Sequence, residues 1–317
     1  MAKKIPKEDI EIKEGFKKRY KKLLGDRYNN FIDYSLRFLK RSIRVNTLKI
    51  KVNELKSKIE SKGYNLEKVP WCKEGFWIEH KEDDRYDFGN LIEHKLGYIY
   101  IQEAASMIPP IVLDPKPNDI ILDMAAAPGS KSTQIASYMD NKGVLVSNDP
   151  NFKRVQALGL NIQRCGILNT IITTKDARYI KGTFDKILLD APCTGSGTIR
   201  KSLSTLKKWN PGGIKRLSKL QKSLILTAFD NLKEGGTLVY STCSLEPEEN
   251  EEVVNFLLMK RDNVTLEKIN LNLESSSPIL EFNGKKYDES IKRTLRLYPQ
   301  DNDTEGFYIA KIKKKNN

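Results

Sequence analysis

The amino-acid sequence predicts an α/β fold: a doubly wound, mainly parallel sheet preceded by a small N-terminal α+β domain. Short aliphatic and β-branched runs alternate with stretches of helical periodicity over residues 119–241. Runs that are apolar throughout are typical of strands buried on both faces. Their alternation with helices indicates a parallel sheet that helices cover on both sides. We place the domain boundary at residue 95, giving domains of residues 1–95 and 96–317.

The expected elements follow one another regularly along the chain. In the larger domain the expected strands are residues 119–124, 143–148, 170–173, 185–189 and 237–241. Helices are expected from the first strand to residue 138, and over 151–164 and 214–232. Residues 307–312 have the pattern of an added antiparallel edge strand. In the smaller domain, apolar residues have helical spacing up to about residue 45, although residues 42–48 also alternate in polarity like a strand. A helix is expected over residues 52–62 and a short strand over residues 76–78.

The composition is typical of a soluble globular protein, and its charge suits a protein that binds a polyanion as well as one that is simply rich in lysine. Hydrophobic residues make up 39% and charged residues 30%, and no apolar run reaches the roughly 18 residues of a membrane span. Met1–Asp9 lacks the apolar core of a signal peptide, so we expect a cytoplasmic protein, and we expect it to be a monomer. The net charge is +14, and residues 1–50 hold 15 Lys and Arg against 6 Asp and Glu. A basic lobe of this kind attracts nucleic acid, although a lysine-rich composition alone gives the same count.

The turn after the first strand has the features of a ligand-binding loop. Ligands of open parallel sheets bind beyond the carboxyl ends of the strands. Small residues let the backbone approach a ligand, and a following helix offers its first amides to a carboxylate. A GxGxxG signature is absent, which counts against NAD, and a simple tight turn is the alternative. The residues of this turn are Ala125, Ala126, Ala127, Pro128, Gly129, Ser130 and Lys131.

Acidic residues follow the next three strands. Asp149, Asp176 and Asp190 come at the ends of the second, third and fourth strands. One such carboxylate is often a helix cap, but three at one edge favour a ligand that carries hydrogen-bond donors. S-adenosyl-L-methionine has a ribose diol, an adenine amine and an ammonium group. We therefore expect it as the cofactor.

Two of the four cysteines lie in a chemically suggestive position. Cys193 and Cys243 follow the fourth and fifth strands in polar turns, and these strands are neighbours in the doubly wound order. The two thiols should therefore meet at one edge. Cys72 and Cys165 lack this context, so we expect them to be structural. The cysteine spacing does not suggest a metal site, and we expect no metal.

A cysteine nucleophile is useful when the target carbon is not nucleophilic by itself. Thiolate addition at carbon 6 of cytosine makes carbon 5 able to accept a methyl group, after which a base removes the carbon 5 proton and the thiolate leaves. Asp190 could hydrogen-bond the ring nitrogen and the exocyclic amine during addition. The residues themselves do not rank the two cysteines.

Several motifs in order resemble the Sun family of RNA (cytosine-5)-methyltransferases, in particular the archaeal transfer RNA enzymes. The resemblance covers roughly residues 41–314. Two residues depart from the usual family pattern: Ala125 stands where the family has Cys, and Ser130 where it has Gly. The matching segments are Arg44–Lys49, Gln102–Ser106, Asp123–Lys131, Asp190–Gly197, Tyr240–Ser244 with Glu249–Glu251, and Gly306–Ala310.

The resemblance implies a Rossmann-like class I methyltransferase fold and a role for each site residue. It implies that Cys243 is the nucleophile and that Cys193 assists release of the product. It implies that residues 125–131 wrap the cofactor, that Asp149 holds the ribose with Arg154 nearby, that Asp176 meets the adenine, and that Asp190 lines both cofactor and base. The implied partner is RNA: transfer RNA first, with ribosomal RNA as the alternative.

Other interpretations stay open at this point. A non-catalytic RNA-binding or assembly factor could keep the same fold, although the intact cysteines argue against it. A DNA cytosine methyltransferase could use Pro192-Cys193, but the second thiol is then unexplained. Phosphate contacts are expected from exposed basic side chains, for which the candidates are Arg41, Arg44, Arg200, Lys201 and Lys313–Lys315.

Overall fold

A mainly parallel sheet forms the centre of the larger part of the chain. The computed structural model describes residues 10–82 and 87–316, so the stretch Met1–Asp9, where we expected no signal peptide, lies outside the described residues. The parallel strands lie in the order β9-β8-β5-β6-β7. The five predicted strands and the doubly wound sheet are confirmed. Their bounds are β5 (Ile120–Asp123), β6 (Val144–Asn148), β7 (Thr170–Thr173), β8 (Phe184–Asp190) and β9 (Leu232–Thr242).

Antiparallel strands extend the sheet beyond β9. β14 (Phe307–Lys314) pairs antiparallel with β9, as predicted for the C-terminal segment. The prediction that it forms the edge was wrong, because β10 (Val264–Glu267) pairs with its other side and β13 (Leu295–Leu297) with its beginning. β10 has only four residues and alternates between buried and half-buried positions. So short a run of mixed polarity gives little signal in the sequence.

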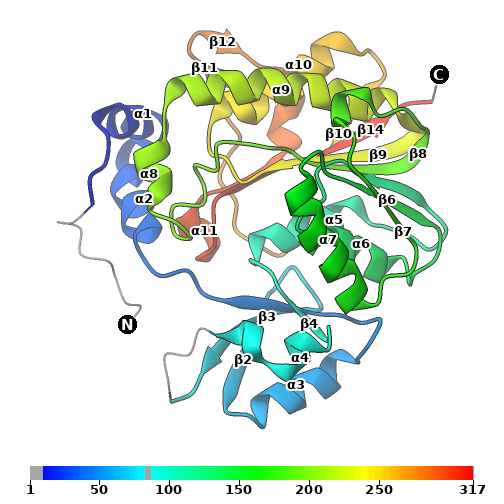
Figure 1. The fold of residues 1–317 in the computed structure, drawn as a ribbon. Coiled ribbons are helices and arrows are strands. Elements are labelled where there is room, and N and C mark those ends of the chain that lie inside the picture. The colour runs from blue at the N-terminus through cyan, green and yellow to red at the C-terminus, as the bar shows by residue number, and fades with distance from the viewer. Residues whose placement is uncertain (1–9, 83–86, 317) are drawn as a thin grey trace.

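Helices cover both faces of the sheet (Figure 1). Helices α5, α6 and α7 pack on one face, and α9 and α10 pack on the other. Successive strand residues alternate between these layers, so that Ile121 belongs to the first core and Leu122 to the second. The bounds are α5 (Ile108–Leu113), α6 (Ser130–Tyr138), α7 (Phe152–Cys165), α9 (Pro211–Asp230) and α10 (Glu251–Lys260). The three predicted helices correspond to α6, α7 and α9.

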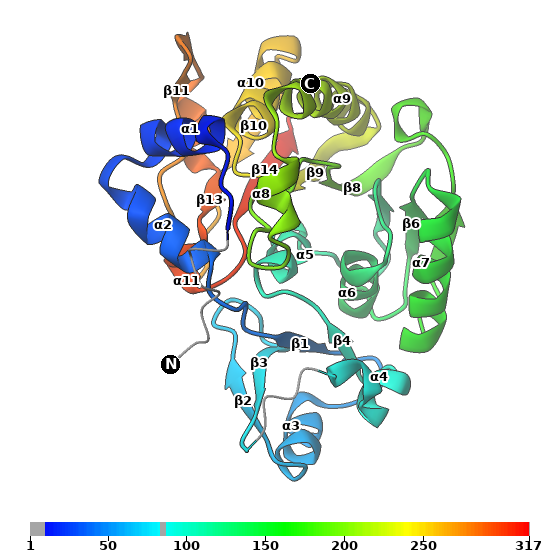
Figure 2. The same ribbon diagram turned by 60° about the vertical axis from the view of Figure 1, so that its left-hand side comes forward.

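A smaller antiparallel sheet of order β2-β3-β1-β4 lies beside the main body (Figures 1 and 2). Its core includes Ile43, Leu55 and Phe76. The strands and helix predicted for this part correspond to β1, α3 and β3. The bounds are β1 (Ser42–Val45), α3 (Val52–Glu60), β2 (Tyr64–Lys68), β3 (Gly75–His80), α4 (Ile92–Lys95) and β4 (Ile99–Ile101).

The first two helices pack against the larger part of the chain. α1 (Glu14–Leu24) and α2 (Tyr28–Ser35) confirm the helical character predicted for this region. Their buried residues Phe16 and Phe31 contact Trp209 and Tyr298, respectively, instead of the small sheet. The division of the chain at residue 95 stays a prediction.

Two kinds of feature are absent from residues 10–82 and 87–316. No helix there has both the length and the apolar character that a membrane span needs. The same residues contain no cluster of three or more His, Cys, Asp or Glu side chains suited to a metal ion. The short elements include α8 (Ser204–Lys208), α11 (Pro299–Asn302), and the hairpin of β11 (Glu281–Phe282) and β12 (Lys285–Lys286).

Candidate active site

The two cysteines that follow β8 and β9 lie against each other. Because β8 and β9 are parallel neighbours, their carboxyl ends reach the same edge of the sheet. The Sγ atoms of Cys193 and Cys243 are 3.3 Å apart, and both residues are partly exposed. Cys72 and Cys165 are buried elsewhere. The predicted meeting of the two thiols is confirmed.

Close backbone packing fixes the loop that carries Cys243. The N–H of Gly197 donates to the Cys243 carbonyl at 2.9 Å, and the Gly197 carbonyl accepts from the N–H of Gly306 at 2.9 Å. A Cβ at residue 197 would lie 2.4 Å from the Gly306 carbonyl oxygen and 2.8 Å from the Cys243 carbonyl oxygen. Only Gly allows this approach, so the two cysteine loops and the segment before β14 meet as bare backbone.

A buried carboxylate, Glu249, ties the two cysteine loops together. It accepts from the Thr194 N–H at 3.0 Å and from the hydroxyl groups of Thr194 and Ser244. Gln221 of α9 donates to Glu249 at 3.1 Å and to the Pro192 carbonyl at 2.8 Å. Burial raises the pKa of Glu249, while these hydrogen bonds oppose the rise. Since Thr194 and Ser244 each follow a cysteine directly, the network holds both thiols in place.

The charges around the two thiols differ. The hydrogen bond to Cys243 raises the pKa of the Cys193 thiol well above its ordinary value, and burial and the negative charges of Glu249 and Asp190 add to the rise. The Lys131 ammonium, in contrast, interacts with Cys243 as well as with Asp190. Burial and the negative neighbours thus favour the protonated thiol at Cys193, whose S–H can donate to Cys243 Sγ 3.3 Å away.

Asp190 lies between the thiols and the turn after β5. Its Oδ2 accepts from Lys131 Nζ at 2.8 Å, and its Oδ1 accepts from Ser241 Oγ at 2.8 Å. Lys131 also donates to Ser106 Oγ at 2.9 Å, and its ammonium lies 5.5 Å from the centre of the Phe307 ring. The Asp190 side chain is 28% exposed, whereas that of Lys131 is 10% exposed. The carboxylate is thus held in place and still reachable.

The turn of residues 125–131 joins β5 to α6 and is buried or half-buried except at Pro128. Gly129 has φ +105°, and a Cβ there would lie 2.9 Å from Leu158 Cδ1. Asn161 supports the turn from outside by donating to the Pro128 carbonyl at 2.9 Å. α6 begins at Ser130 without a side-chain cap, which leaves its first N–H groups to a ligand or to water.

The predicted carboxylates after β6 and β7 already have protein partners. Asp149 is 1% exposed, accepts from the Asn151 N–H at 3.0 Å and pairs with Arg154 at 3.0 Å. Asp176 caps a short 3-10 turn and binds Arg178 at 2.6 Å. The hydrogen bonds from Arg178 lower the pKa of Asp176. Asp176 is therefore ionised, and both carboxyl groups have further lone pairs able to accept from a ligand.

Sequence reasoning missed another carboxylate, Asp123, at the end of β5. It is 1% exposed, and its Oδ2 accepts from Ser132 Oγ at 2.7 Å. Its Oδ1 is buried and has no hydrogen-bond partner within the part of the chain that the structure describes. Burial raises the pKa of Asp123 to about 7. The strand-end rule that pointed to Asp149 would have found it.

Arg44, which we expected to contact phosphates, is buried instead. It is 2% exposed, and its guanidinium donates to the Ser130 carbonyl at 2.7 Å, to the Thr133 hydroxyl at 2.9 Å and to Gln102. It thereby joins β1 of the small sheet to the first turn of α6. The prediction was wrong because a basic residue in a basic lobe gives no sign of burial.

Two other predicted phosphate contacts are also engaged within the protein. The Arg200 side chain is 1% exposed, donates to the Phe38 carbonyl at 2.7 Å and pairs with Asp303 at 2.8 Å. Lys314 donates to the Leu232 carbonyl at 2.8 Å. Arg41 and Lys201 are exposed, so phosphate contacts from these residues remain a prediction.

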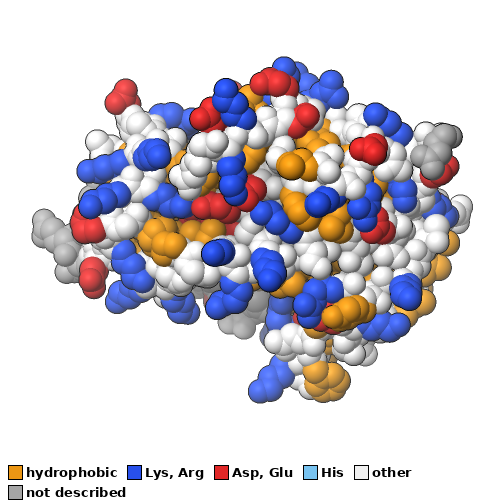
Figure 3. All heavy atoms as spheres, turned by 90° about the horizontal axis from the view of Figure 1, so that it is seen from above, with side chains coloured by type: hydrophobic (Ala, Val, Ile, Leu, Met, Phe, Trp, Pro, Cys, Tyr) orange, Lys and Arg blue, Asp and Glu red, His pale blue; other side chains and the backbone are white. Residues whose placement is uncertain are grey.

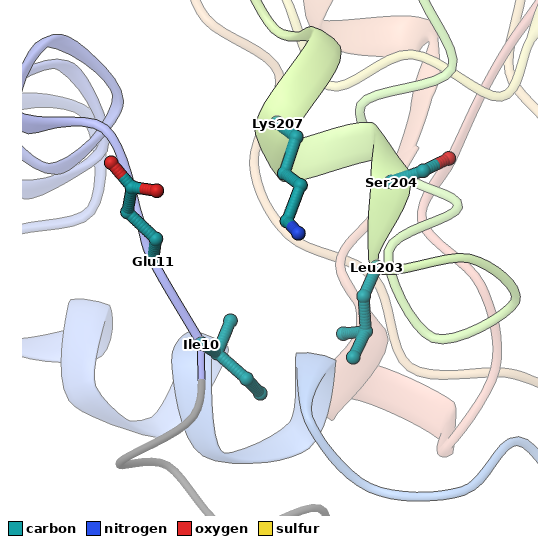
Figure 4. Close-up of a pocket in the computed structure, with 5 residues that line it drawn as sticks. All are labelled: Ile10, Glu11, Leu203, Ser204 and Lys207. Carbon is teal, nitrogen blue, oxygen red and sulfur yellow. The ribbon is translucent and has the colours of Figure 1, made fainter.

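A surface pocket of about 190 Å³ lies beside α8 (Figure 4). Lys207 extends from α8 into this space. None of the site residues described above lines it, so it is separate from the thiol site. Its lining residues are Ile10, Glu11, Leu203, Ser204 and Lys207.

Comparison with known proteins shows which family this chain belongs to. A family model described as 16S rRNA methyltransferase RsmB/F matches residues 110–313. The chain belongs to the RsmB/F family. A second family model, the N-terminal domain of 16S rRNA methyltransferase RsmF, matches residues 12–104. The RsmB/F family is the Sun family indicated by the sequence motifs, and this member is an S-adenosyl-L-methionine-dependent RNA (cytosine-5)-methyltransferase.

Relatives of this RsmB/F protein are named for two different substrates, transfer RNA and ribosomal RNA. The tRNA (cytosine(49)-C(5))-methyltransferase of Pyrococcus abyssi is 50% identical over 315 residues, which cover 96% of this chain and 99% of that enzyme. Ribosomal RNA small subunit methyltransferase F of Aliivibrio salmonicida is 45% identical over 294 residues, which cover 90% of this chain. This chain spans only 60% of the length of that second relative.

Solved structures share the whole architecture of this RsmB/F protein. A methyltransferase homologue from Pyrococcus horikoshii has a TM-score of 0.85 and 42% identity, with 95% of each chain covered. NSun6 from Pyrococcus horikoshii, solved with the S-adenosylmethionine analogue SFG, has a TM-score of 0.83 and 26% identity, with 96% of this chain and 99% of that chain covered. The predicted class I methyltransferase fold is confirmed.

The residues of this RsmB/F protein fit S-adenosyl-L-methionine. The unpartnered Oδ1 of Asp123 is an acceptor suited to an ammonium group. Gly129 lets the turn pack closely against Leu158, and the uncapped start of α6 suits a carboxylate. Asp149, which contacts Arg154 beside the turn, can accept from a ribose diol. The donor groups of the cofactor thus find matching acceptors.

Mild oxidation provides a direct test of the thiol geometry. A disulfide needs its sulfur atoms at about 2.05 Å, and a 3.3 Å separation requires only a small shift of the two loops. Treatment with the thiol oxidant diamide should lower the four free thiols to two, with loss of methyl transfer that dithiothreitol reverses. Peptide mapping should find Cys193 linked to Cys243. Four titratable thiols after oxidation would contradict this arrangement.

Proposed function

We propose that this RsmB/F protein methylates carbon 5 of a cytosine in transfer RNA, with Cys243 as the nucleophile. The observation that carries the proposal is the contact of two thiols beside Asp190 and the cofactor turn. One thiol is needed to activate carbon 5 by adding to carbon 6. The second thiol has a role if it assists release of the methylated product. An amine methyltransferase needs neither thiol, and a one-cysteine mechanism leaves one of them unexplained.

The protein's part in the reaction follows from the positions of these groups. Cys243 adds as a thiolate to carbon 6, which makes carbon 5 electron-rich, while Asp190 hydrogen-bonds the ring nitrogen and exocyclic amine. S-adenosyl-L-methionine supplies the methyl group that carbon 5 takes. A base then takes the carbon 5 proton, the electrons of that C–H bond restore the 5,6 double bond, and the electrons of the bond between carbon 6 and sulfur leave with Cys243 as its thiolate. Cys193, protonated at 3.3 Å, donates its S–H to the departing Cys243 thiolate.

Cofactor binding is assigned to the edge formed by β5, β6 and β7. Residues 125–131 surround the methionine portion, with Asp123 as an added acceptor for its ammonium group. Asp149 holds the ribose, and Arg154 keeps that carboxylate oriented from 3.0 Å. Asp176 meets the adenine amine. Burial of Asp123 and Asp149 supports these roles, because ligand donors would satisfy carboxylates that water reaches poorly.

The choice of transfer RNA is supported by length and identity. The Pyrococcus abyssi relative, named for cytosine 49 of transfer RNA, matches over nearly its entire length, whereas the ribosomal RNA relative matches over 60%. Figure 3 shows Lys and Arg side chains spread over the surface and mixed with carboxylates. Lys215, Arg216 and Lys219 are exposed along α9. This distribution suits contacts to a folded polyanion, whose binding should weaken as salt rises.

Bisulfite sequencing tests the substrate. RNA from a strain that lacks this protein should lose 5-methylcytosine at one or a few transfer RNA positions and keep it in ribosomal RNA. The purified protein should restore the methyl group on unmodified transfer RNA. Loss confined to ribosomal RNA would favour the alternative substrate. A cytoplasmic monomer without a metal ion remains part of the proposal, and light scattering of the active protein, with and without a chelator, tests the last two points.

A further inference from the structure

A second buried carboxylate, Glu246, joins the first helix to the loop that carries Cys243. Glu246 is fully buried and lies three residues beyond Cys243. Its Oε1 accepts from the hydroxyl of Tyr20 at 2.8 Å, and its Oε2 accepts from Nε of Arg19 at 2.6 Å, both from α1. The indole N–H of Trp209, which follows α8, also donates to Oε1 at 2.8 Å. The scheme above gives these four residues no role.

Glu246 is linked to the nucleophile through the backbone of the same loop. The N–H of Glu246 donates to Ser244 Oγ at 3.1 Å, and Ser244 follows Cys243 directly. Between them, the N–H of Leu245 donates to Ser196 Oγ at 2.9 Å. A displacement of Glu246 would therefore strain or break the bond to Ser244, the neighbour of the proposed nucleophile.

Arg19 supplies the positive charge for this buried carboxylate. The Glu246 side chain is 0% exposed and that of Arg19 is 16% exposed, so water screens their interaction little. Removing one partner of a buried ion pair leaves an uncompensated charge, which destabilises the structure more than the intact pair stabilises it. Without Arg19, we expect the carboxylate to move toward water and to take the loop with it.

Packing holds α1 in the place that these hydrogen bonds require. The rings of Phe16 and Tyr20 stack with their centres 4.1 Å apart, and Tyr20 stacks on Phe31 of α2 at 5.2 Å. α1 lies beside α8 in Figures 1 and 2. The donors that reach Glu246 are thus fixed by aromatic contacts as well as by their own hydrogen bonds.

We propose that Arg19, Tyr20 and Glu246 are positioning residues for methyl transfer, which makes α1 part of the framework that holds the nucleophile. α1 places the Cys243 loop through Glu246, in addition to the bonds from Glu249 that tie the two cysteine loops together. The inference rests on the proposed function, because the position of this loop matters to the chemistry only if Cys243 is the nucleophile.

The test measures addition and cofactor binding separately. In a Cys193→Ala background, where the RNA adduct should accumulate, the rate of adduct formation at saturating RNA and S-adenosyl-L-methionine reports the addition step. Arg19→Met should lower this rate about 10- to 100-fold, because a misplacement of about 1 Å can lower a rate about 10²-fold. The Kd of S-adenosyl-L-methionine should stay within about twofold, since an effect on addition alone leaves cofactor binding unchanged.

A second substitution separates positioning from a simple loss of stability. Glu246→Gln removes the buried charge, so the loss of Arg19 should matter less when it is present. Adding E246Q to R19M should therefore raise the rate of adduct formation about fivefold or more above that of R19M alone. A merely structural role would lower the melting temperature and leave the rate of the folded protein unchanged.

Two further variants complete the design. Tyr20→Phe keeps the stacked ring, removes only the hydroxyl group that donates to Glu246, and serves if R19M folds poorly. It should lower the rate of adduct formation about three- to tenfold, the effect of one hydrogen bond. Arg27→Met is the matched control, because Arg27 follows α1 and pairs with Asp301 at 2.9 Å instead of with the Cys243 loop. Its rate should equal that of the background.

The outcomes separate the two proposals. Equal rates of adduct formation with and without the changes at Arg19 and Tyr20, or no gain when E246Q is added to R19M, would overturn the inference and leave methylation intact. A rate lowered equally by R27M would do the same. Absence of methyl transfer by the wild-type protein on every RNA supplied would instead contradict the proposed function.

Discussion

Replacing Cys243 with Ala should abolish methyl transfer and the covalent RNA adduct together. The proposed nucleophile is then missing, and we expect a loss of more than about 10³-fold. Replacing Cys193 with Ala should leave addition intact and stall release, because the departing thiolate loses the S–H donor at 3.3 Å. Labelled-methyl incorporation and denaturing gels of protein with RNA measure both effects.

The two cysteine variants form a reciprocal test. An adduct that persists with Cys243→Ala and vanishes with Cys193→Ala would reverse the two roles. Cys72→Ala is the matched control, because Cys72 is a buried thiol outside the site and its loss should leave both measurements as in the wild type. Burial raises the pKa of the Cys72 thiol to about 12, so it takes no part in thiolate chemistry at neutral pH.

Replacing Arg44 with Met should lower the free energy of unfolding by about 1–3 kcal/mol, the cost of leaving buried polar acceptors without a donor. The change leaves the Ser130 carbonyl, the Thr133 hydroxyl and Gln102 without their donor. Since Ser130 begins α6, cofactor affinity should fall as well. Urea unfolding and calorimetric titration with S-adenosyl-L-methionine measure the two effects.

An exposed neighbour provides the control for Arg44. Arg41→Met removes a positive charge from the same segment, at an exposed position, and should change stability by less than about 0.5 kcal/mol. Wild-type stability and weaker RNA binding in Arg44→Met would contradict the buried network and restore the phosphate-contact role.

The strand pattern and the thiol pair were predictable from the sequence for a common reason. Strands buried on both faces must be apolar throughout, so β5 to β9 stand out along the chain. Parallel pairing then brings every strand end to one edge. Cys193 and Cys243, each a few residues beyond neighbouring strands, consequently had to lie close together. The hydrophobic pattern and the strand order were sufficient to predict this contact, because the two cysteines follow neighbouring strands.

The same reasoning could not predict contacts between segments that are distant in the sequence. Neither the burial of Arg44 nor the pairing of β10 with β14 has a periodic signature. Arg19 and Glu246 are separated by 227 residues and look in the sequence like ordinary surface charges.

The amino-acid sequence thus determined the parallel sheet, the edge at which ligands bind and the meeting of two cysteines, because these follow from hydrophobic periodicity and strand order. Only the tertiary structure decided which charged residues are buried and what they contact. The raised pKa of the Cys193 thiol depends on desolvation and on neighbours brought together by folding, which no run of consecutive residues encodes.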